Sequence, residues 1–423
     1  MVDQGRWPTA HMSGGRLAGQ WRPQPAGCGY YIAVAILVPI EMGQGLKNRG
    51  KGRADMEDRR KAVEDYTETK LEHIGAMSFD PQLAEKNIEN MIGAVQVPVG
   101  FVGPLRVNGD EARGEFLVPL ATTEGALLAS VNRGCSVISA AGGAASVVVK
   151  DEMTRAPVFR VKDARHAVQA GKWVEGNFQK LKEAAEATTG HGKLLSAAVF
   201  ASGRSLFVRF AYSTGDAMGM NMATIATEAA SRLIEKETGA VLVSVSGNLC
   251  TDKKPAAVNS ILGRGKIVLA DVTVPRALLE EKMHATPEAV AETCFRKCEV
   301  GSAMAASYGY NAHAANMLAA VYIATGQDPA QVAEGSMVMT TCEVVDGDLY
   351  ISVRLPCVEV GTVGGGTRLP CQSEALSMIG CAGAGKARKL AEIVGAVVLA
   401  GELSTLCAQA AGQLGSAHKA LGR

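Results

Sequence analysis

The stretch from Ser246 to Asn259 holds residue types that could stabilise a developing negative charge. At its centre Asp252 stands directly before Lys253 and Lys254, among small and mostly uncharged residues. The next residue is a proline, which biases Lys254 toward an extended backbone and predicts a loop rather than a helix interior. A lysine held in such a loop could stabilise an oxyanion. Taken alone, the same residues more often form a solvated surface turn.

A second candidate for acid–base chemistry is Glu124, the only acid at the start of an apolar segment. Thr122 or Thr123 could cap a helix that begins at Glu124. The carboxylate could then simply complement the helix dipole. Alternatively, it could be a partly buried acid that holds a proton near neutral pH.

Residues 300–325 are small or apolar on all sides, which predicts one long buried helix. His313 is the lone histidine of this segment and is more typical of a satisfied core residue, or of one that supports residues of a site from behind, than of a ligand. Asp328 follows directly, and its carboxylate would be desolvated unless a cation pairs with it.

Two glycine-containing segments could approach a ligand. The predicted helix that starts in residues 215–222 carries Asp216 among methionines and glycines, where free N–H groups could receive a phosphate or polarise a ring amide. The methionines could equally be core filler. The loop 361–367 contains four glycines, which would let the backbone lie close to a ligand.

Residues 380–387 nearly match a phosphate-binding P-loop. However, Ala387 stands where the motif needs Ser or Thr to hold magnesium, and the preceding residues 374–379 predict a helix rather than a strand. No G-x-G-x-x-G run follows a predicted strand and opens a helix, so a Rossmann site is not supported either.

The composition excludes several functional classes. A chain of 423 residues with 47% hydrophobic residues can form a large core in about two or three domains. The net charge of +1 gives no strong field toward nucleic acid or an anionic membrane. Ten cysteines lack paired metal-ligand spacings, apart from an isolated Cys294 and Cys298, so we predict reduced thiols, no zinc site and a cytoplasmic location.

Residues 1–50 differ from the rest of the chain. Their apolar run, Tyr30 to Ile40, has eleven residues, too few for a helix that spans a bilayer. Two arginines precede it, as in a signal peptide, but no small-residue cleavage site follows. A buried strand or an over-long reading frame, with the true start at Met42 or Met56, is the favoured interpretation.

Alternating patterns define the elements that must position these residues. Residues 54–71 and 84–92 predict helices, the second closed by Gly93, and residues 116–120 predict a strand. Residues 157–245 predict a strand at 157–161, a helix at 164–187, strands at 194–200 and 205–212, a helix at 217–237 and a strand at 240–245. This β-α-β-β-α-β order is that of a split βαβ, or ferredoxin-like, unit. Residues 390–414 predict a closing helix.

The predicted fold class is therefore α+β: a large helix-rich domain around a long central helix, with an inserted ferredoxin-like domain. The predicted boundaries are an N-terminal extension at 1–55, a helical region at 56–88, the large domain at 89–155 and 256–423, the inserted domain at 156–245 and a connecting loop at 246–255.

Seven runs, taken together, resemble one enzyme family. They lie at residues 89–105, 121–134, 216–222, 246–259, 309–316, 326–328 and 361–367. In order and content they resemble class I 3-hydroxy-3-methylglutaryl-coenzyme A (HMG-CoA) reductase, over about residues 70 to 420, and its short, soluble archaeal and bacterial members more than the membrane-anchored eukaryotic ones. The resemblance implies reduction of HMG-CoA to mevalonate and free coenzyme A with two NADPH, the committing step of isoprenoid biosynthesis by the mevalonate pathway.

The resemblance also implies roles for four residues. Lys253 would stabilise the oxyanion that forms when hydride reaches the thioester. His418 would protonate the coenzyme A thiolate, and Glu124 would supply the proton for the second reduction. Asp328 would contact the lysine and share in a coupled protonation.

Further residues are carried over to the binding sites. The HMG group would be held by Arg155, Ser246, Asp252 and Lys254, with Asn316 near the thioester, and coenzyme A or the adjoining wall would contact Ser130, Asn132 and Arg133. The nicotinamide would lie between Asp216, Met218, Gly219, Met220 and Met222 on one side and Val363, Gly364 and Thr367 on the other. No metal is implied. The family builds its site between subunits, with Glu89 to Gly93 in the contact, so a homodimer or a dimer of dimers is implied.

One stretch departs from the family pattern. Some relatives carry a Ser-Arg pair that holds the 2′-phosphate of NADPH, whereas Gly190 stands here in place of the arginine. His191 or Lys193 could bind the phosphate instead, and we expect NADPH to be preferred over NADH. The alternatives are an NAD-dependent relative that oxidises mevalonate, a catalytically inactive binding protein on the same fold, and a P-loop hydrolase.

Overall fold

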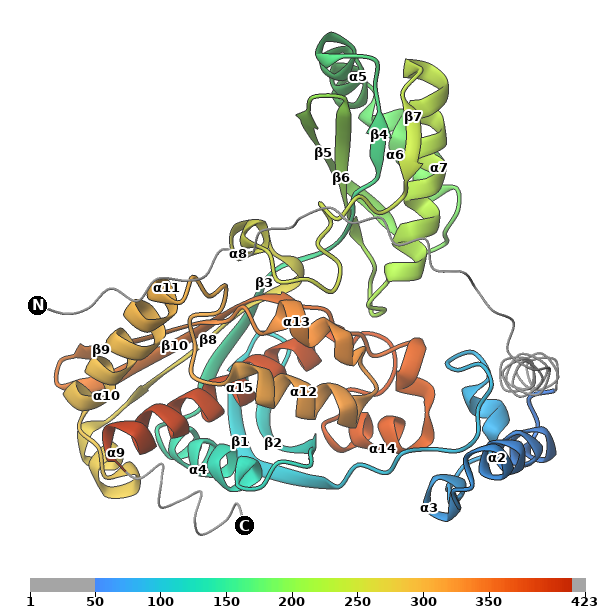
Figure 1. The fold of residues 1–423 in the computed structure, drawn as a ribbon. Helices are drawn as coiled ribbons and strands as arrows, with labels where there is room; N and C mark the ends of the chain where they lie inside the picture. The colour runs from blue at the N-terminus through green and yellow to red at the C-terminus, as the bar shows by residue number, and fades with distance from the viewer. Residues whose placement is uncertain (1–49, 413–423) are drawn as a thin grey trace, which may run out of the picture.

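A long buried helix, α15 (Ala387–Ala410), lies at the centre of the larger part of the molecule (Figure 1). The computed structural model describes residues 50–412. Nearly every side chain of α15 is buried, because the helix lies between a sheet on one side and helices α4 (Leu127–Ala140) and α12 (Ala314–Thr325) on the other. A helix that is apolar on all faces needs such a site on every side.

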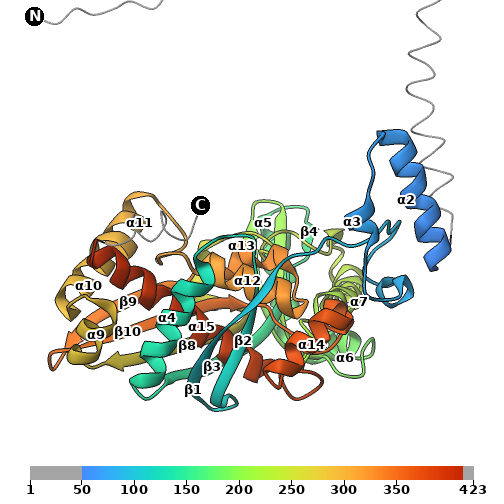
Figure 2. The same ribbon diagram turned by 90° about the horizontal axis from the view of Figure 1, so that it is seen from below.

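The large sheet runs in the order β2-β1-β3-β8-β10-β9. Its strands are β1 (Val99–Gly109), β2 (Arg113–Ala121), β3 (Ala144–Arg155), β8 (Arg264–Val274), β9 (Met339–Val345) and β10 (Asp348–Val358). The β1–β3 pair is parallel and the other pairs are antiparallel. Helices α9 (Arg276–Met283) and α10 (Pro287–Cys294) lie near its β9 end (Figure 2).

A smaller unit stands on the far end of β3 (Figure 1). Its elements follow as β4 (Val158–Arg160), α5 (Ala164–Gly176), α6 (Phe178–Glu186), β5 (Lys193–Ser202), β6 (Ser205–Ser213), α7 (Met220–Thr238) and β7 (Val241–Ser244). The strand order β7-β4-β6-β5 is antiparallel throughout and is that of a split βαβ unit. Its apolar core is separate from that of the large sheet.

Short elements connect these layers. The helix α2 (Arg53–Thr67), the turn of helix α3 (Glu72–Gly75) and the 3-10 turn η1 (Pro81–Ala84) lie at the edge of the molecule (Figure 2). The other short elements are α8 (Ala257–Leu262), the π-helical turn η2 (Phe295–Gly301), α11 (Ser302–Met304), η3 (Pro329–Gln331), α13 (Val332–Gly335), η4 (Gly365–Arg368) and α14 (Pro370–Met378).

The predicted single helix over residues 300–325 is wrong. The chain leaves the helical path after Met304 and re-enters it only at Ala314. In between, the Asn311 amide donates to the carbonyls of Ser336 and Val338, and the Tyr310 N–H donates to Val338 as well. These bonds to the start of β9 replace helical ones, as an asparagine side chain readily does. The long central helix is therefore α15.

Three other predicted helices need correction. Residues 84–92 form turns rather than a helix, with Asn90 at φ 52° and Gly93 at φ 156°. The helix predicted at 164–187 is two helices that meet at Asn177. The helix predicted from 217 begins at Met220, because Gly219 has a left-handed backbone with φ 85°.

The predictions for residues 1–49 and for His418 lie outside the described residues. The closing helix predicted at 390–414 runs from Ala387 to Ala410, so its predicted end is wrong. Within residues 50–412, α15 alone is long and apolar enough to cross a membrane. However, 94% of its apolar window is buried inside the protein, as in a core helix.

Candidate active site

The loop between β7 and α8 brings Lys253 to Asp328. The lysine ammonium lies 2.8 Å from a carboxylate oxygen of Asp328, and the two side chains are 47% and 27% exposed. Asp328 is fixed by its position at the start of η3, where its other oxygen accepts the Ala330 N–H. Gly326 turns the chain out of α12 with φ 71°, and a Cβ there would lie 2.4 Å from the Gly366 carbonyl. The loop 361–367 therefore packs directly beside Asp328.

The rest of the loop is tied to β3 and β8. Arg155 donates to the Ser246 hydroxyl at 3.1 Å and lies 3.5 Å from Asp252. The other oxygen of Asp252 pairs with buried Arg264 at 3.0 Å. Burial opposes ionisation of Asp252, but the charge of Arg264 and a hydrogen bond from Gln331 hold the pKa of this carboxyl below its usual value. An ionised Asp252 between two guanidinium groups gives the loop a defined charge pattern.

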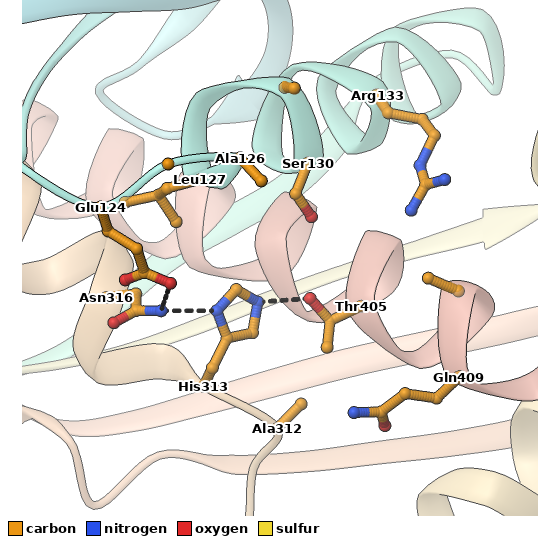
Figure 3. A pocket seen from close by; sticks show the side chains of 13 residues that line it. Glu124, Ala126, Leu127, Ser130, Arg133, Ala312, His313, Asn316, Thr405 and Gln409 are labelled. Carbon is orange, nitrogen blue, oxygen red and sulfur yellow. Dashed lines mark hydrogen bonds between the residues drawn. The ribbon is translucent and has the colours of Figure 1, made fainter. Parts of the chain in front are cut away.

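Glu124 lies in a different hollow, a cavity of about 310 Å³ between α4, α12 and α15 (Figure 3). The prediction that a helix begins at Glu124 is wrong, because α4 begins at Leu127 after Ala126 with φ 70°. Thr122 does accept the Glu124 N–H, at 3.0 Å. In the single chain Glu124 is exposed at the cavity mouth rather than partly buried.

A chain of polar side chains crosses the same cavity (Figure 3). The Asn316 amide donates to Glu124 at 3.4 Å and lies 3.3 Å from one ring nitrogen of His313. The other ring nitrogen lies 2.6 Å from the Thr405 hydroxyl. Ser130 and Arg133 also line the cavity, where Arg133 donates to Ser404. Asn132 points elsewhere and accepts the Gly103 N–H.

The geometry therefore brings only part of the predicted catalytic set together within one chain. Lys253 meets Asp328, and Glu124 meets Asn316. Among residues 50–412, no ion pair joins Lys253 to Glu124.

A wider hollow, about 740 Å³, begins at Asp328. Its lining comes from both the small and the large unit and includes Met218, Gly219, Met220, Met222, Val363, Gly364 and Thr367. This lining is largely apolar, with backbone groups of the glycine-rich loop at its edge, which suits a flat ring with an amide. The lysine–aspartate pair thus lies at the rim of this hollow.

Asp216 does not line this hollow, unlike Met218 and Gly219. Its carboxylate accepts the N–H groups of Gly385, Lys386 and Ala387 at 2.6 to 3.0 Å, at the start of α15. Its carbonyl accepts the Thr362 N–H at 2.8 Å. Burial opposes ionisation, but the three N–H donors lower the pKa of this carboxyl. Asp216 therefore holds the small unit against the large one, and it occupies the N–H groups that a P-loop would offer to phosphate.

The segment 188–193 packs against Met222, one of the residues that line this hollow. A Cβ on Gly192 would lie 2.0 Å from the Met222 sulfur, so the turn packs on the hollow wall. The exposed Lys193 lies 3.2 Å from Glu186, and the His191 N–H donates to the Thr189 hydroxyl. Both side chains are exposed on this turn.

Two features were not predicted from the sequence. A cavity of about 490 Å³ adjoins Pro255 at the end of the loop and is lined by Lys297, several hydroxyls and Asn311. His313 lies in the cavity of Glu124 rather than in the core. Only the three-dimensional structure reveals Lys297, since no motif surrounds it in the sequence.

Comparisons with known proteins all give one family. The family model for hydroxymethylglutaryl-coenzyme A reductase matches residues 55–423. The 3-hydroxy-3-methylglutaryl-coenzyme A reductase of Haloferax volcanii is 56% identical over 372 residues, which are 87% of this chain and 92% of the relative. That of Pyrococcus horikoshii is 55% identical over 383 residues, 88% of this chain and 93% of the relative.

Solved structures have the same fold. A class II 3-hydroxy-3-methylglutaryl-CoA reductase from Streptococcus pneumoniae, described as bound to NADPH in open conformations, superposes with a TM-score of 0.65. It is 20% identical and covers 90% of this chain and 97% of its own. A likeness at this identity shows the shared fold.

Proposed function

The chain belongs to the hydroxymethylglutaryl-coenzyme A reductase family of the mevalonate pathway, and on that premise we propose how its residues perform the reaction. The overall reaction consumes HMG-CoA, two NADPH and two protons, and releases mevalonate, coenzyme A and two NADP⁺. One observation carries the proposal: the Lys253–Asp328 pair lies at the rim of the hollow whose lining suits a nicotinamide.

NADPH, when bound, supplies the hydride for each of the two reductions. Lys253 presents its ammonium to the thioester oxygen, which becomes negative as hydride reaches the carbonyl carbon. Asp328, at 2.8 Å, fixes the direction of that ammonium. His418 delivers a proton to the departing thiolate, which would otherwise add back to the aldehyde.

In the second reduction the aldehyde oxygen takes the negative charge. Lys253 stabilises this oxygen as it did the first, and Glu124 delivers the proton that turns it into the alcohol. Asn316, which donates to Glu124, holds that acid beside the thioester end of the substrate. Ser130 and Arg133 line the cavity of Glu124, where coenzyme A would enter, whereas Asn132 does not line it and accepts the Gly103 N–H.

Two cations, a hydroxyl group and a carboxylate are proposed to bind the acidic end of the substrate. Arg155, Ser246, Asp252 and Lys254 would hold the carboxylate and the hydroxyl of the HMG group. Asp252 is ionised, and its ion pairs with Arg155 and Arg264 fix its position. Its carboxylate can therefore accept a hydrogen bond from the substrate hydroxyl. The cavity beside Pro255 adds the exposed cation Lys297 on the same side of the loop.

The site requires two subunits. Glu124 lies in one hollow, whereas Lys253 contacts Asp328 at the rim of the other, so we place Glu124 of one subunit opposite Lys253 of the partner subunit. Apolar side chains beside the 89–93 run support such a contact, since Val95, Val99 and Phe101 are 81%, 61% and 58% exposed. The assembly is a homodimer or a dimer of dimers.

NADPH is the proposed cofactor. Lys193 supplies a positive charge and His191 a ring N–H on the turn that packs against Met222, where a 2′-phosphate could be held. A structural neighbour from Streptococcus pneumoniae is described as bound to NADPH. The oxidative, NAD-dependent direction is not favoured, because curated archaeal relatives at 50–56% identity carry the reductase name.

Class I membership and a cytoplasmic location complete the proposal. The archaeal reductases are more than twice as similar in sequence as the class II structural neighbours, at 56% against 20%. All cysteines within residues 50–412 are free thiols, as in a reducing compartment.

A spectrophotometric assay with HMG-CoA and each nicotinamide cofactor tests the proposed function. We expect two NADPH oxidised for each HMG-CoA consumed, with a kcat/KM for NADPH well above that for NADH. Equal kcat/KM values would refute the cofactor preference, and no oxidation of either cofactor would refute the activity.

A further inference from the structure

A cluster of buried charges lies directly beneath the catalytic loop. Its centre is Arg264, whose side chain is fully buried on β8. The guanidinium lies 3.0 Å from Asp252, 2.7 Å from Glu334 and 3.5 Å from Glu359. Both glutamates are fully buried as well. Buried charges persist in proteins only where opposite charges or hydrogen bonds compensate them, so these residues form a specific cluster.

Glu334, in the short helix α13, reaches the backbone of the catalytic loop. One of its oxygens accepts the Lys253 N–H at 2.5 Å and the Arg264 guanidinium at 2.7 Å. The other oxygen accepts the Asn259 amide at 3.1 Å and lies 3.4 Å from the Thr251 hydroxyl. A single carboxylate thus connects the loop, α8 and β8 to α13.

The loop needs such support because its backbone is unfavourable. Asn248, Thr251 and Lys253 have φ values of 65°, 63° and 60°. These left-handed conformations are costly for residues with a side chain, and they persist only where the surroundings hold them. At Lys253 the group that holds the backbone N–H is Glu334.

We propose that Glu334 is a positioning residue that holds Lys253 in its left-handed conformation and so aims the ammonium at the reacting oxygen. This inference rests on the proposed function, in which Lys253 is the cation of the reaction. Glu334 touches neither substrate nor cofactor in this account. It acts only through the backbone of Lys253 and through Arg264, which in turn fixes Asp252.

The two buried glutamates, Glu334 and Glu359, differ in charge. Burial and the nearby charge of Glu334 raise the pKa of Glu359 well above its usual value. Burial also raises the pKa of Glu334, while Arg264 and the Lys253 N–H oppose that rise. Glu359 is further from Arg264, and one of its oxygens has no protein partner. The shorter contact with Arg264 and the bond from the Lys253 N–H therefore favour the charge on Glu334 and the proton on Glu359.

Arg264 supplies the cation of this cluster. Glu334, Glu359 and Cys357 place their ligand atoms within 4.8 Å of one another, a spacing that could hold an ion. The Arg264 guanidinium already supplies the positive charge beside both carboxylates. Burial raises the pKa of the Cys357 thiol, so an ion would also have to displace the thiol proton.

The difference in charge between Glu334 and Glu359 provides a matched pair of variants in the full-length protein. Glu334→Gln removes the charge that faces Arg264 and leaves one acceptor oxygen in place of two. Its NH₂ group must then face either the Lys253 N–H or the Asn259 amide, which cannot rotate because its oxygen accepts from Arg209. Glu359→Gln replaces a neutral acid by a neutral amide of the same shape. The assay measures kcat and the KM values for HMG-CoA and NADPH, with thermal unfolding as a check on folding.

We expect Glu334→Gln to lower kcat by about 10- to 100-fold, the effect of a lost buried hydrogen bond to a charged group, with both KM values within about 3-fold of the wild type. Glu359→Gln should stay within about 3-fold of the wild type in kcat. Should Glu334→Gln fail to fold, Glu334→Asp keeps the charge but draws the carboxylate away from Lys253, and the same kcat loss is expected.

A merely structural role would lower kcat equally in both variants or raise both KM values, and either result would overturn the proposal. Full kcat in Glu334→Gln would overturn it as well. Lys253→Ala, assayed alongside, separates this failure from failure of the proposed function: an inactive Lys253→Ala with an active Glu334→Gln rejects the positioning role alone.

Discussion

The contact between Lys253 and Asp328 leads to a prediction whose size follows from the structure. Asp328→Asn removes the charge but keeps an oxygen that can accept the Ala330 N–H at the start of η3. Two unit charges 2.8 Å apart interact by about 6 kcal/mol at an effective dielectric constant of about 20. Because Lys253 is 47% exposed, water screens most of this, and the pair contributes only about 1 kcal/mol to stability.

The effect on catalysis should be larger than the effect on stability. Without Asp328 the flexible lysine side chain is free to rotate, and a misplacement of about 1 Å can cost about 100-fold in rate. We expect kcat for HMG-CoA to fall by about 10- to 100-fold, with the unfolding midpoint lowered by no more than about 2 °C.

Steady-state NADPH oxidation and thermal unfolding measure the two effects. The matched control is Glu115→Gln, which breaks a surface ion pair of the same 2.8 Å length, with Arg106, away from both hollows. The control should leave kcat unchanged. A kcat for Asp328→Asn above about half that of the wild type would refute the reasoning, because the carboxylate would then have no part in directing the lysine.

Three further predictions concern the domain contact, the cofactor and the assembly. Asp216→Asn should lower the unfolding free energy by about 1–3 kcal/mol, because an amide cannot accept all three N–H groups of residues 385–387. The pKa of Asp216 is lowered on folding, so its contribution is present above about pH 4 and is lost as the pH falls further; unfolding curves for the two proteins that stay parallel below pH 4 would contradict this. His191→Ala combined with Lys193→Ala should lower kcat/KM for NADPH by about 10-fold and leave that for NADH unchanged, and an equal loss with both cofactors would show that these side chains do not bind the 2′-phosphate. Glu124→Gln and Lys253→Ala, each inactive alone, should regain activity when their subunits are mixed and reassembled, and no regain in confirmed heterodimers would place both residues in one subunit's site.

Part of this organisation could be predicted from the sequence because it depends on local rules. The proline after Lys254 predicted a loop, and a loop lies between β7 and α8. Alternating strands and amphipathic helices in residues 157–245 predicted the order in which those elements occur. The long motifs predicted the family, which the comparisons confirm.

The rest could not be predicted, because it depends on contacts between distant residues. Near residue 311 the hydrogen bonds from Asn311 to the carbonyls of Ser336 and Val338 replace helical bonds. The composition of the segment does not predict them. Glu334 lies in the unremarkable run Val332–Gly335, where nothing indicates that its side chain is buried against Lys253 and Arg264. The family resemblance places Asp216 beside the nicotinamide, and nothing in the sequence around it indicates that its carboxylate accepts N–H groups at the start of a helix about 170 residues later.

The ammonium of Lys253 is the group on which the whole account depends, and turnover of HMG-CoA by Lys253→Ala tests it most directly. The variant should unfold at the wild-type temperature and bind NADPH normally, yet oxidise it with a kcat at least about 1,000-fold below that of the wild type. A folded Lys253→Ala enzyme that reduces HMG-CoA at a rate close to that of the wild type would contradict the account.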